Sequence, residues 1–244
     1  MFQKRVLNQF CICVFVTFFL AGCSLFIKND AAVEVDSVEK IQITPAEILE
    51  ASSKAMSTLN TLRFRITHEV GETELFPGIY IDRMDVSIVF PDEYHIKFYG
   101  KGNSNQITKG EVIVTKGKTH ITNPFTGKLE ELSGTSSPLK FFKPQVGIRS
   151  IFSSIEKVTF VDSVQESQQQ VLLSGEMPAN ALLSIFGNLV LDESVGVELL
   201  IDLKTKYLIE TKIIGPIVSS DKKEVVRKIE FVSFNKKIQI KKID

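Results

Sequence analysis

Leu62-Arg63-Phe64-Arg65-Ile66-Thr67 carries an apolar side chain at every second position and a polar one between them. Because successive side chains of a β-strand point to opposite faces, this alternation predicts a strand with one dry face and one wet face. One-sided strands of this kind are typical of antiparallel sheets. The stretch therefore predicts an antiparallel sheet that buries one face and leaves the other in water.

The same alternation recurs along most of the chain that follows. Turn signals such as Lys116-Gly117 separate neighbouring segments. Further strands are predicted over residues 84–90, 94–98, 112–114, 120–122, 158–164, 171–175, 197–203, 207–214 and 225–234. A sheet of roughly nine to eleven strands has to twist and curl.

Three short helices interrupt the strands, and each has one apolar face. Thr44-Pro45-Ala46-Glu47 has the pattern of a capping box, and the helix that it starts is apolar along Ile48–Leu59. An apolar patch broken by Pro144 precedes a second helix over residues 148–155. The third helix presents one apolar face made of Leu182, Ile185, Phe186 and Leu189.

One-sided helices need a dry partner, and the dry face of the sheet is the simplest one. The predicted fold class is therefore α+β, with a single large curved antiparallel β-sheet, a half-barrel, and short helices packed on its concave face around an apolar cavity. Whether the space between sheet and helices is a hollow or a solid core is left open by the pattern.

The N-terminus has the order of features of a bacterial lipoprotein export signal. Two basic residues precede an apolar run that is too short for an ordinary spanning helix. Leu20, Ala21 and Gly22 form the lipobox before Cys23, whose thiol takes a diacylglyceryl group, with a third acyl chain as an open alternative. The other two interpretations are an uncleaved N-terminal anchor and a secretory signal with a chance cysteine.

This segment predicts three regions and a location. Residues 1–22 are the signal peptide, residues 23–43 are the lipidated N-terminus with a flexible tether, and residues 44–244 are the domain. The alternative for the tether is an added edge strand. The protein is expected at the extracytoplasmic face of the bacterial cell membrane, in the cell envelope, where the lipid anchor attaches it to the membrane.

Composition limits the classes of function. The 29 basic and 29 acidic residues balance, which argues against nucleic acid as a partner because that binding rests on many phosphate contacts. Cys11 and Cys13 lie in the predicted signal, so the exported chain keeps Cys23 alone. A domain without disulfides has to be held together by its core.

The sequence carries no recognisable catalytic or cofactor motif. His68, His95 and His120 fall in separate strand segments without the spacing of a zinc site. A nucleophile elbow, a phosphate-binding glycine loop and a dinucleotide fingerprint are all missing from the sequence. The prediction is a protein that is not an enzyme and needs no cofactor beyond the lipid on Cys23, although a triad assembled only in space would escape this test.

Several turns and strand ends together resemble the LppX/LprA/LprF/LprG lipoproteins, best known from mycobacteria. The resemblance covers nearly all of the domain and departs at Leu129, where the family often has an aromatic residue. The stretches that carry it are Thr67-His68-Glu69, Val89-Phe90-Pro91-Asp92, residues 113–124, Thr126-Gly127-Lys128, residues 173–179 and residues 197–202.

This resemblance implies a LolA-like half-open barrel that holds acylated lipids or glycolipids between sheet and helices. It also implies a membrane lipid transporter as a further candidate partner. The residues expected to line the lipid cavity are the apolar ones of the strands and helices that would face it: Phe64, Ile66, Val86, Ile88, Phe98, Phe142, Ile148, Ile151, Phe152, Leu182, Phe186, Leu199 and Ile201.

Three functions compete at this point. The leading hypothesis is a membrane-anchored lipoprotein that carries acylated lipid in envelope lipid transport, because burial of acyl chains in a dry hollow needs no catalytic group. The alternative is an envelope-stress or scaffold lipoprotein that binds a protein partner instead of a lipid. The third is a hydrolase with an unrecognised site.

Overall fold

The computed structural model describes residues 43–76, 78–102, 107–123, 126–132, 143–161, 169–186, 192–241 and 243. The predicted signal peptide, the lipobox with Cys23, and the tether up to residue 42 lie outside the described residues. The expectations about those segments therefore remain predictions.

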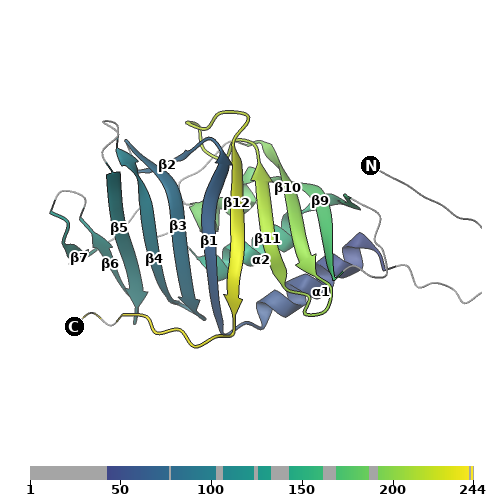
Figure 1. The fold of residues 1–244 in the computed structure, drawn as a ribbon, viewed down its shortest axis with the longest axis horizontal. Coiled ribbons are helices and arrows are strands. Elements are labelled where there is room, and N and C mark those ends of the chain that lie inside the picture. The colour runs from purple at the N-terminus through teal and green to yellow at the C-terminus, as the bar shows by residue number, and fades with distance from the viewer. Residues whose placement is uncertain are drawn as a thin grey trace, which may run out of the picture. The chain divides into compact units, whose positions relative to one another are not determined.

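The described strands form one twelve-stranded antiparallel sheet (Figure 1). The order across the sheet is β7-β6-β5-β4-β3-β1-β12-β11-β10-β9-β8, with β2 paired to β3. The sheet is not closed, because β7 and β8 lie at its two opposite ends. The strands are β1 Thr61–Val70, β2 Thr73–Phe76, β3 Ile79–Val89, β4 Glu93–Gly102, β5 Ile107–Thr115, β6 Lys118–Thr122, β7 Leu129–Glu131, β8 Glu156–Phe160, β9 Gln170–Pro178, β10 Ser194–Asp202, β11 Leu208–Ile214 and β12 Val226–Phe234.

The first and last strands pair in the middle of the sheet. Ile66 of β1 lies opposite Ile229 of β12, and Phe64 lies opposite Phe231 with their rings 5.9 Å apart. Just before β1, the backbone N–H of Asn60 donates to Oδ1 of Asn235, 2.8 Å away. The two ends of the domain sequence therefore meet at its centre.

Helix α1, Pro45–Ser57, begins as the sequence predicts. The Glu47 N–H donates to Thr44 Oγ1 at 3.3 Å, and the Thr44 N–H donates to Glu47 Oε2 at 2.8 Å. This reciprocal pair satisfies two N–H groups that the first helical turn would otherwise leave without partners.

The other two helices differ from the prediction in detail. Helix α2, Pro144–Ser154, begins at Pro144 and not at Ile148, because proline fits the first helical turn, where no N–H is needed. The apolar patch predicted before Pro144 lies outside the described residues. The third helix is split into a 3₁₀ turn, η1 Ala179–Leu182, and a single α-helical turn, α3 Leu183–Phe186. Leu189, predicted on the same helix, lies outside the described residues.

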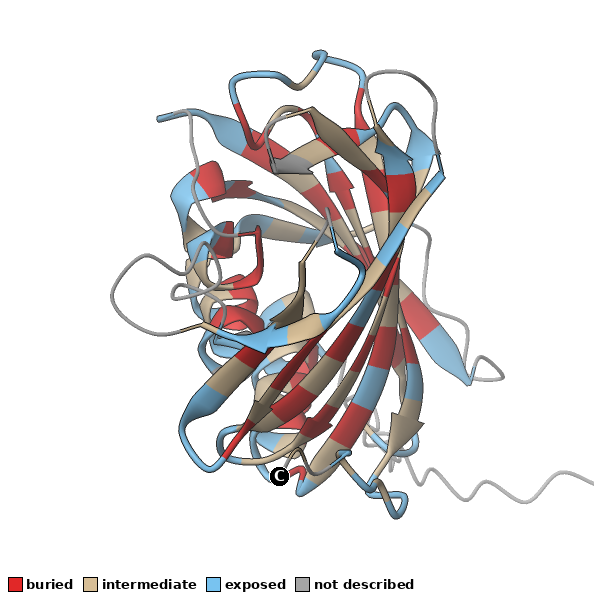
Figure 2. Ribbon diagram, turned by 90° about the vertical axis from the view of Figure 1, so that its left-hand side faces the viewer, coloured by how far each residue is buried: buried red, intermediate tan, exposed pale blue. Residues whose placement is uncertain are grey.

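The sheet has one apolar face and one polar face. Buried and exposed residues alternate along the strands, and the helices lie on one side of the curved sheet (Figure 2). The face beneath the helices, here called the inner face, contributes its buried side chains to one hydrophobic cluster with α1, α2, η1 and α3. The opposite face, here called the outer face, carries most of the charged side chains of the described strands. The predicted fold class, a large open antiparallel sheet with short helices on one face, is thereby confirmed, and the apolar cavity between them remains a prediction.

Candidate functional site

The inner face and the helices above it form the candidate site. Twelve of the thirteen residues predicted to line a cavity are buried and belong to the same cluster; Phe142 lies outside the described residues. The twelve are Phe64, Ile66, Val86, Ile88, Phe98, Ile148, Ile151, Phe152, Leu182, Phe186, Leu199 and Ile201. Their presence on one face is observed, and their role as cavity walls remains a prediction.

Helix α2 packs closely against its neighbours. Ile151 has no exposed surface, which means that no space large enough for a water molecule touches its side chain. Gly147 lies against α3 so closely that a Cβ there would be 2.3 Å from Cγ1 of Ile185. A ligand can therefore reach this part of the inner face only if α2 moves away from the sheet.

The cluster reaches the surface beside α1 and α2. A groove of about 490 Å³ runs between these helices and the start of β8, and Leu49, Phe152, Ile155 and Val158 line it together with polar side chains of α1. Phe152 belongs both to this groove and to the inner cluster. The groove is therefore the place where an apolar chain could pass from the surface to the inner face.

One end of the inner face holds a buried ion pair that is not among the residues predicted from the sequence. Arg227 and Asp221 pair with each other, and neither side chain has any exposed surface. Arg227 also donates from Nε to Thr73 Oγ1 at 2.7 Å and lies 5.7 Å from the ring centre of Phe186. The inner face thus ends in a fixed charge pair beneath α3.

The carboxylate of this pair also binds backbone. Asp221 Oδ2 accepts hydrogen bonds from the N–H groups of Ile217 at 2.7 Å and Val218 at 3.0 Å. Burial lowers the pKa of Arg227, and the attraction of Asp221 opposes that shift. The pair therefore connects β12 to the loop that follows β11.

A sequence signal for this pair does exist. Arg227, Ile229 and Phe231 share one face of β12, so the arginine occupies a position that alternation reserves for the core. Its partner could not be found in the same way, because Asp221 lies in a loop without periodicity. An arginine among the core-facing positions of a strand predicts that a buried hydrogen-bond acceptor lies nearby, but it does not identify the residue that supplies the acceptor.

His68 adjoins the same polar group. Its Nε2 lies 2.8 Å from Thr73 Oγ1, the atom that also accepts from Arg227. Burial, and secondly the charge of Arg227, lower the pKa of His68 to about 4. The imidazole is therefore neutral at physiological pH.

The other two histidines lie on the outer face near the β7 end of the sheet. His95 Nε2 is 2.8 Å from Glu111 Oε2, and His120 Nε2 is 3.9 Å from Glu131 Oε2. Among the described residues, no three metal-binding side chains converge as they would around an ion. Within the same residues, no helix combines the length and apolar character needed to cross a bilayer.

Comparison with known proteins extends the description of the fold. Neither a protein-family profile nor a curated protein sequence matches the chain. The structure of LprF from Mycobacterium bovis matches with a TM-score of 0.60 at 15% identity, covering 81% of this chain and 96% of LprF. The Mycobacterium tuberculosis lipoprotein LppX matches with a TM-score of 0.53 at 14% identity, covering 81% of this chain and 98% of LppX. At these identities the likeness confirms, at the level of the fold, the resemblance predicted from the sequence.

Proposed function

We propose that this chain is a membrane-anchored extracytoplasmic lipoprotein that binds acylated lipids or glycolipids between its sheet and helices and carries them in the cell envelope. The observation that carries the proposal is the apolar inner face, which short helices cover in the part of the chain that the structure describes. The fold that the chain shares with LprF and the lipoprotein LppX supports it.

The energetics of acyl burial fit this arrangement. Each buried CH₂ group contributes about 0.8 kcal/mol, so a long acyl chain on the inner face gains enough free energy to offset the ordering of its own bonds. The acyl chain of the lipid enters through the groove beside Phe152, and α2 moves outward from the sheet to make room for it. No catalytic group is needed for binding and release.

The anchor is the second part of the proposal. Cys23 becomes the N-terminus after cleavage behind Gly22 and carries a diacylglyceryl group, with or without a third acyl chain. Replacement of Cys23 by Ala is expected to abolish the added mass and the partitioning into detergent. If the variant and the native chain show the same processed mass and the same partitioning, the anchor is not on Cys23.

Lipid uptake is tested with a substitution that fills the proposed binding site. The full chain is purified in detergent, stripped of lipid and offered a mixture of diacyl and triacyl lipids, and native mass spectrometry measures the adduct. Ile151→Trp is expected to reduce the adduct strongly, because the indole occupies the space that α2 would open for an acyl chain. Ile107→Trp is the matched control, because 82% of Ile107 is exposed and the residue lines neither the groove beside Phe152 nor the groove on the outer face.

Two results contradict the proposal. The first is a native chain that takes up none of the lipids offered while circular dichroism shows that it is folded. The second is an Ile151→Trp chain whose folded fraction takes up lipid as well as the control does. Phe152→Ala separates stability from binding: it is expected to lower the melting temperature by removing contacts in the cluster while leaving room for lipid.

A further inference from the structure

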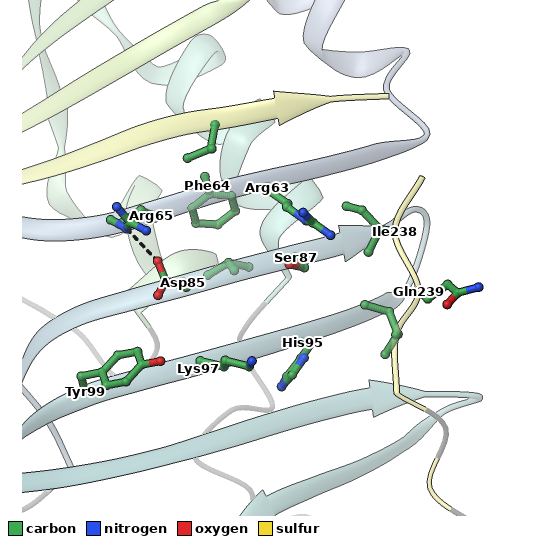
Figure 3. Close-up of a pocket in the computed structure, with 13 residues that line it drawn as sticks. Arg63, Phe64, Arg65, Asp85, Ser87, His95, Lys97, Tyr99, Ile238 and Gln239 are labelled. Carbon is green, nitrogen blue, oxygen red and sulfur yellow. Dashed lines mark hydrogen bonds and ion pairs between the residues drawn. The ribbon is translucent and has the colours of Figure 1, made fainter. Parts of the chain in front are cut away.

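The outer face carries a second cavity that the proposed function does not use. A groove of about 460 Å³ lies between the outer face of β1, β3 and β4 and the chain that follows β12. Arg63, Arg65, Asp85 and Lys97 line its floor, and Ile238–Ile240 form its wall (Figure 3). We call this space the outer groove. Its volume lies in the range of small-molecule sites.

The wall of the outer groove is held at both ends. After β12, the Asn235 N–H donates to the Thr61 carbonyl at 2.9 Å, and Thr61 Oγ1 donates to the Lys236 carbonyl at 2.7 Å. Farther along, Lys241 Nζ lies 3.9 Å from Glu111 Oε1 on β5. The segment between these contacts runs past the ends of the strands without joining the sheet as a strand (Figure 1). The outer groove lies between this segment and the strands.

The floor of the outer groove has an excess of positive charge. Its carboxylate, Asp85, is shared by two arginines: Arg65 Nε lies 2.7 Å from Oδ1, and Arg83 Nε lies 3.1 Å from Oδ2. Arg63 and Lys97 have no carboxylate within ion-pair distance among the described residues, and both side chains are exposed. These two cations are therefore available to an anion.

We propose that the outer groove binds a phosphate-bearing organic ligand through Arg63 and Lys97. Guanidinium groups match the oxygens of phosphate in a fork geometry, and a nearby ammonium adds a second positive charge. The ester part of the ligand lies against the apolar surface of Val232, Ile238 and Ile240. The site is on the opposite face from the proposed lipid site, so the two proposals can fail separately.

Isothermal titration calorimetry of the full chain in a non-ionic detergent tests this site. The two probes are inorganic phosphate and glycerophosphoglycerol, which is a lipid headgroup without acyl chains. Arg63→Gln and Lys97→Gln are each expected to weaken binding roughly five- to tenfold, because each removes one charge-assisted contact at an exposed site. Lys204→Gln is the matched control, since Lys204 is exposed in the turn between β10 and β11.

A shortened chain separates the groove from a general basic surface. Removal of residues 238–244 takes away the wall and leaves Arg63 and Lys97 in place, so binding is expected to weaken while the melting temperature stays nearly unchanged. Binding of phosphate alone supports the site and points to a free phosphate ester, whereas binding of the diester supports the site and points to a lipid headgroup. Absence of binding by both probes, or affinities unchanged in both the substituted and the shortened chains, overturns the proposal.

Discussion

Arg227 and Lys228 are neighbours on β12, yet they lie on opposite faces of the sheet. Arg227 lies on the inner face with no exposed surface and pairs with Asp221. The Lys228 side chain is 24% exposed on the outer face and lies 2.8 Å from Glu230 and 3.5 Å from Glu210. Burial lowers the pKa of Arg227, whereas the hydrogen bond to Glu230 raises the pKa of Lys228. The same kind of charge is thus destabilised by one face and stabilised by the other.

The difference lies in the solvent that each face provides. On the inner face, no water is present to solvate a charge that has lost its partner. Removal of one member of the pair therefore leaves a buried, unpaired charge, which strongly lowers the free energy of unfolding. On the outer face, water and salt replace a lost partner almost completely. The two faces should therefore differ strongly in their response to substitution.

The largest effect is expected from Asp221→Ala. The substitution leaves Arg227 buried without its carboxylate and removes the acceptor of two backbone N–H groups. The free energy of unfolding, measured with urea, should fall by about 3–5 kcal/mol. The double variant Asp221→Leu/Arg227→Met should recover a large part of this loss, because no charge is then left unpaired. A double variant no more stable than Asp221→Ala would show that the pair itself stabilises the fold.

Leu199→Ala tests the apolar part of the inner face. Leu199 is 1% exposed, and its truncation should lower the free energy of unfolding by about 3 kcal/mol, through lost burial and the cavity left behind. Glu198→Ala, one residue away on the outer face, should stay within about 0.5 kcal/mol of the native chain. Similar losses for the two variants would contradict the division of the sheet into a dry and a wet face.

His68 makes the inner face sensitive to acid. Its folded-state pKa of about 4 is below the ordinary 6.5, so the unfolded chain binds more protons than the folded chain between these values. The full free energy of unfolding is therefore present above pH 6.5, and it falls by about 3 kcal/mol as the pH drops to 4. Urea unfolding at several pH values should show a smaller acid-induced loss for His68→Gln than for the native chain. Parallel stability–pH curves for the two proteins would show that His68 is not the cause.

The smallest effect is expected from Lys228→Gln. Its ion pairs with Glu210 and Glu230 are accessible to water, so the free energy of unfolding should fall by less than about 1 kcal/mol. The difference from the native chain should shrink further in 1 M salt, where charges are screened within about 3 Å. A loss that matches that of Asp221→Ala would mean that the outer face is not the solvated surface described here.

Much of the fold could be predicted because alternation reports burial directly. The pattern in residues 62–67 and its repeats identified ten of the twelve strands, and the capping box at Thr44 identified the start of α1. The missed strands, β2 and β7, are four and three residues long, and so few positions cannot establish a period of two. The start of α2 was predicted four residues too late, at Ile148, because a proline that ends an apolar run can also begin the next helix.

The candidate site was predictable only where it is apolar. Residues such as Phe64 and Leu199 were assigned to the inner face from their positions in the strand pattern, and the structure places them there. The partner of Arg227 and the outer groove depend on loops and on the chain after β12. The alternation within a segment does not indicate which distant segment packs against it. The ion pair and the outer groove could therefore be recognised only in the three-dimensional structure.

The central pairing of β1 with β12 has a consequence for how the chain is made. Each half of the sheet is a meander of strands that follow one another in sequence, and β12 supplies the only partner for one edge of β1 among the described strands. The ribosome synthesises β12 after all the other strands. Until then, the half of the sheet that contains β1 has an unpaired strand edge, and such an edge can pair with another molecule and cause aggregation. Folding before the C-terminus has been synthesised would therefore expose the edge of β1. A chain that stays unfolded until synthesis is complete avoids this risk of aggregation.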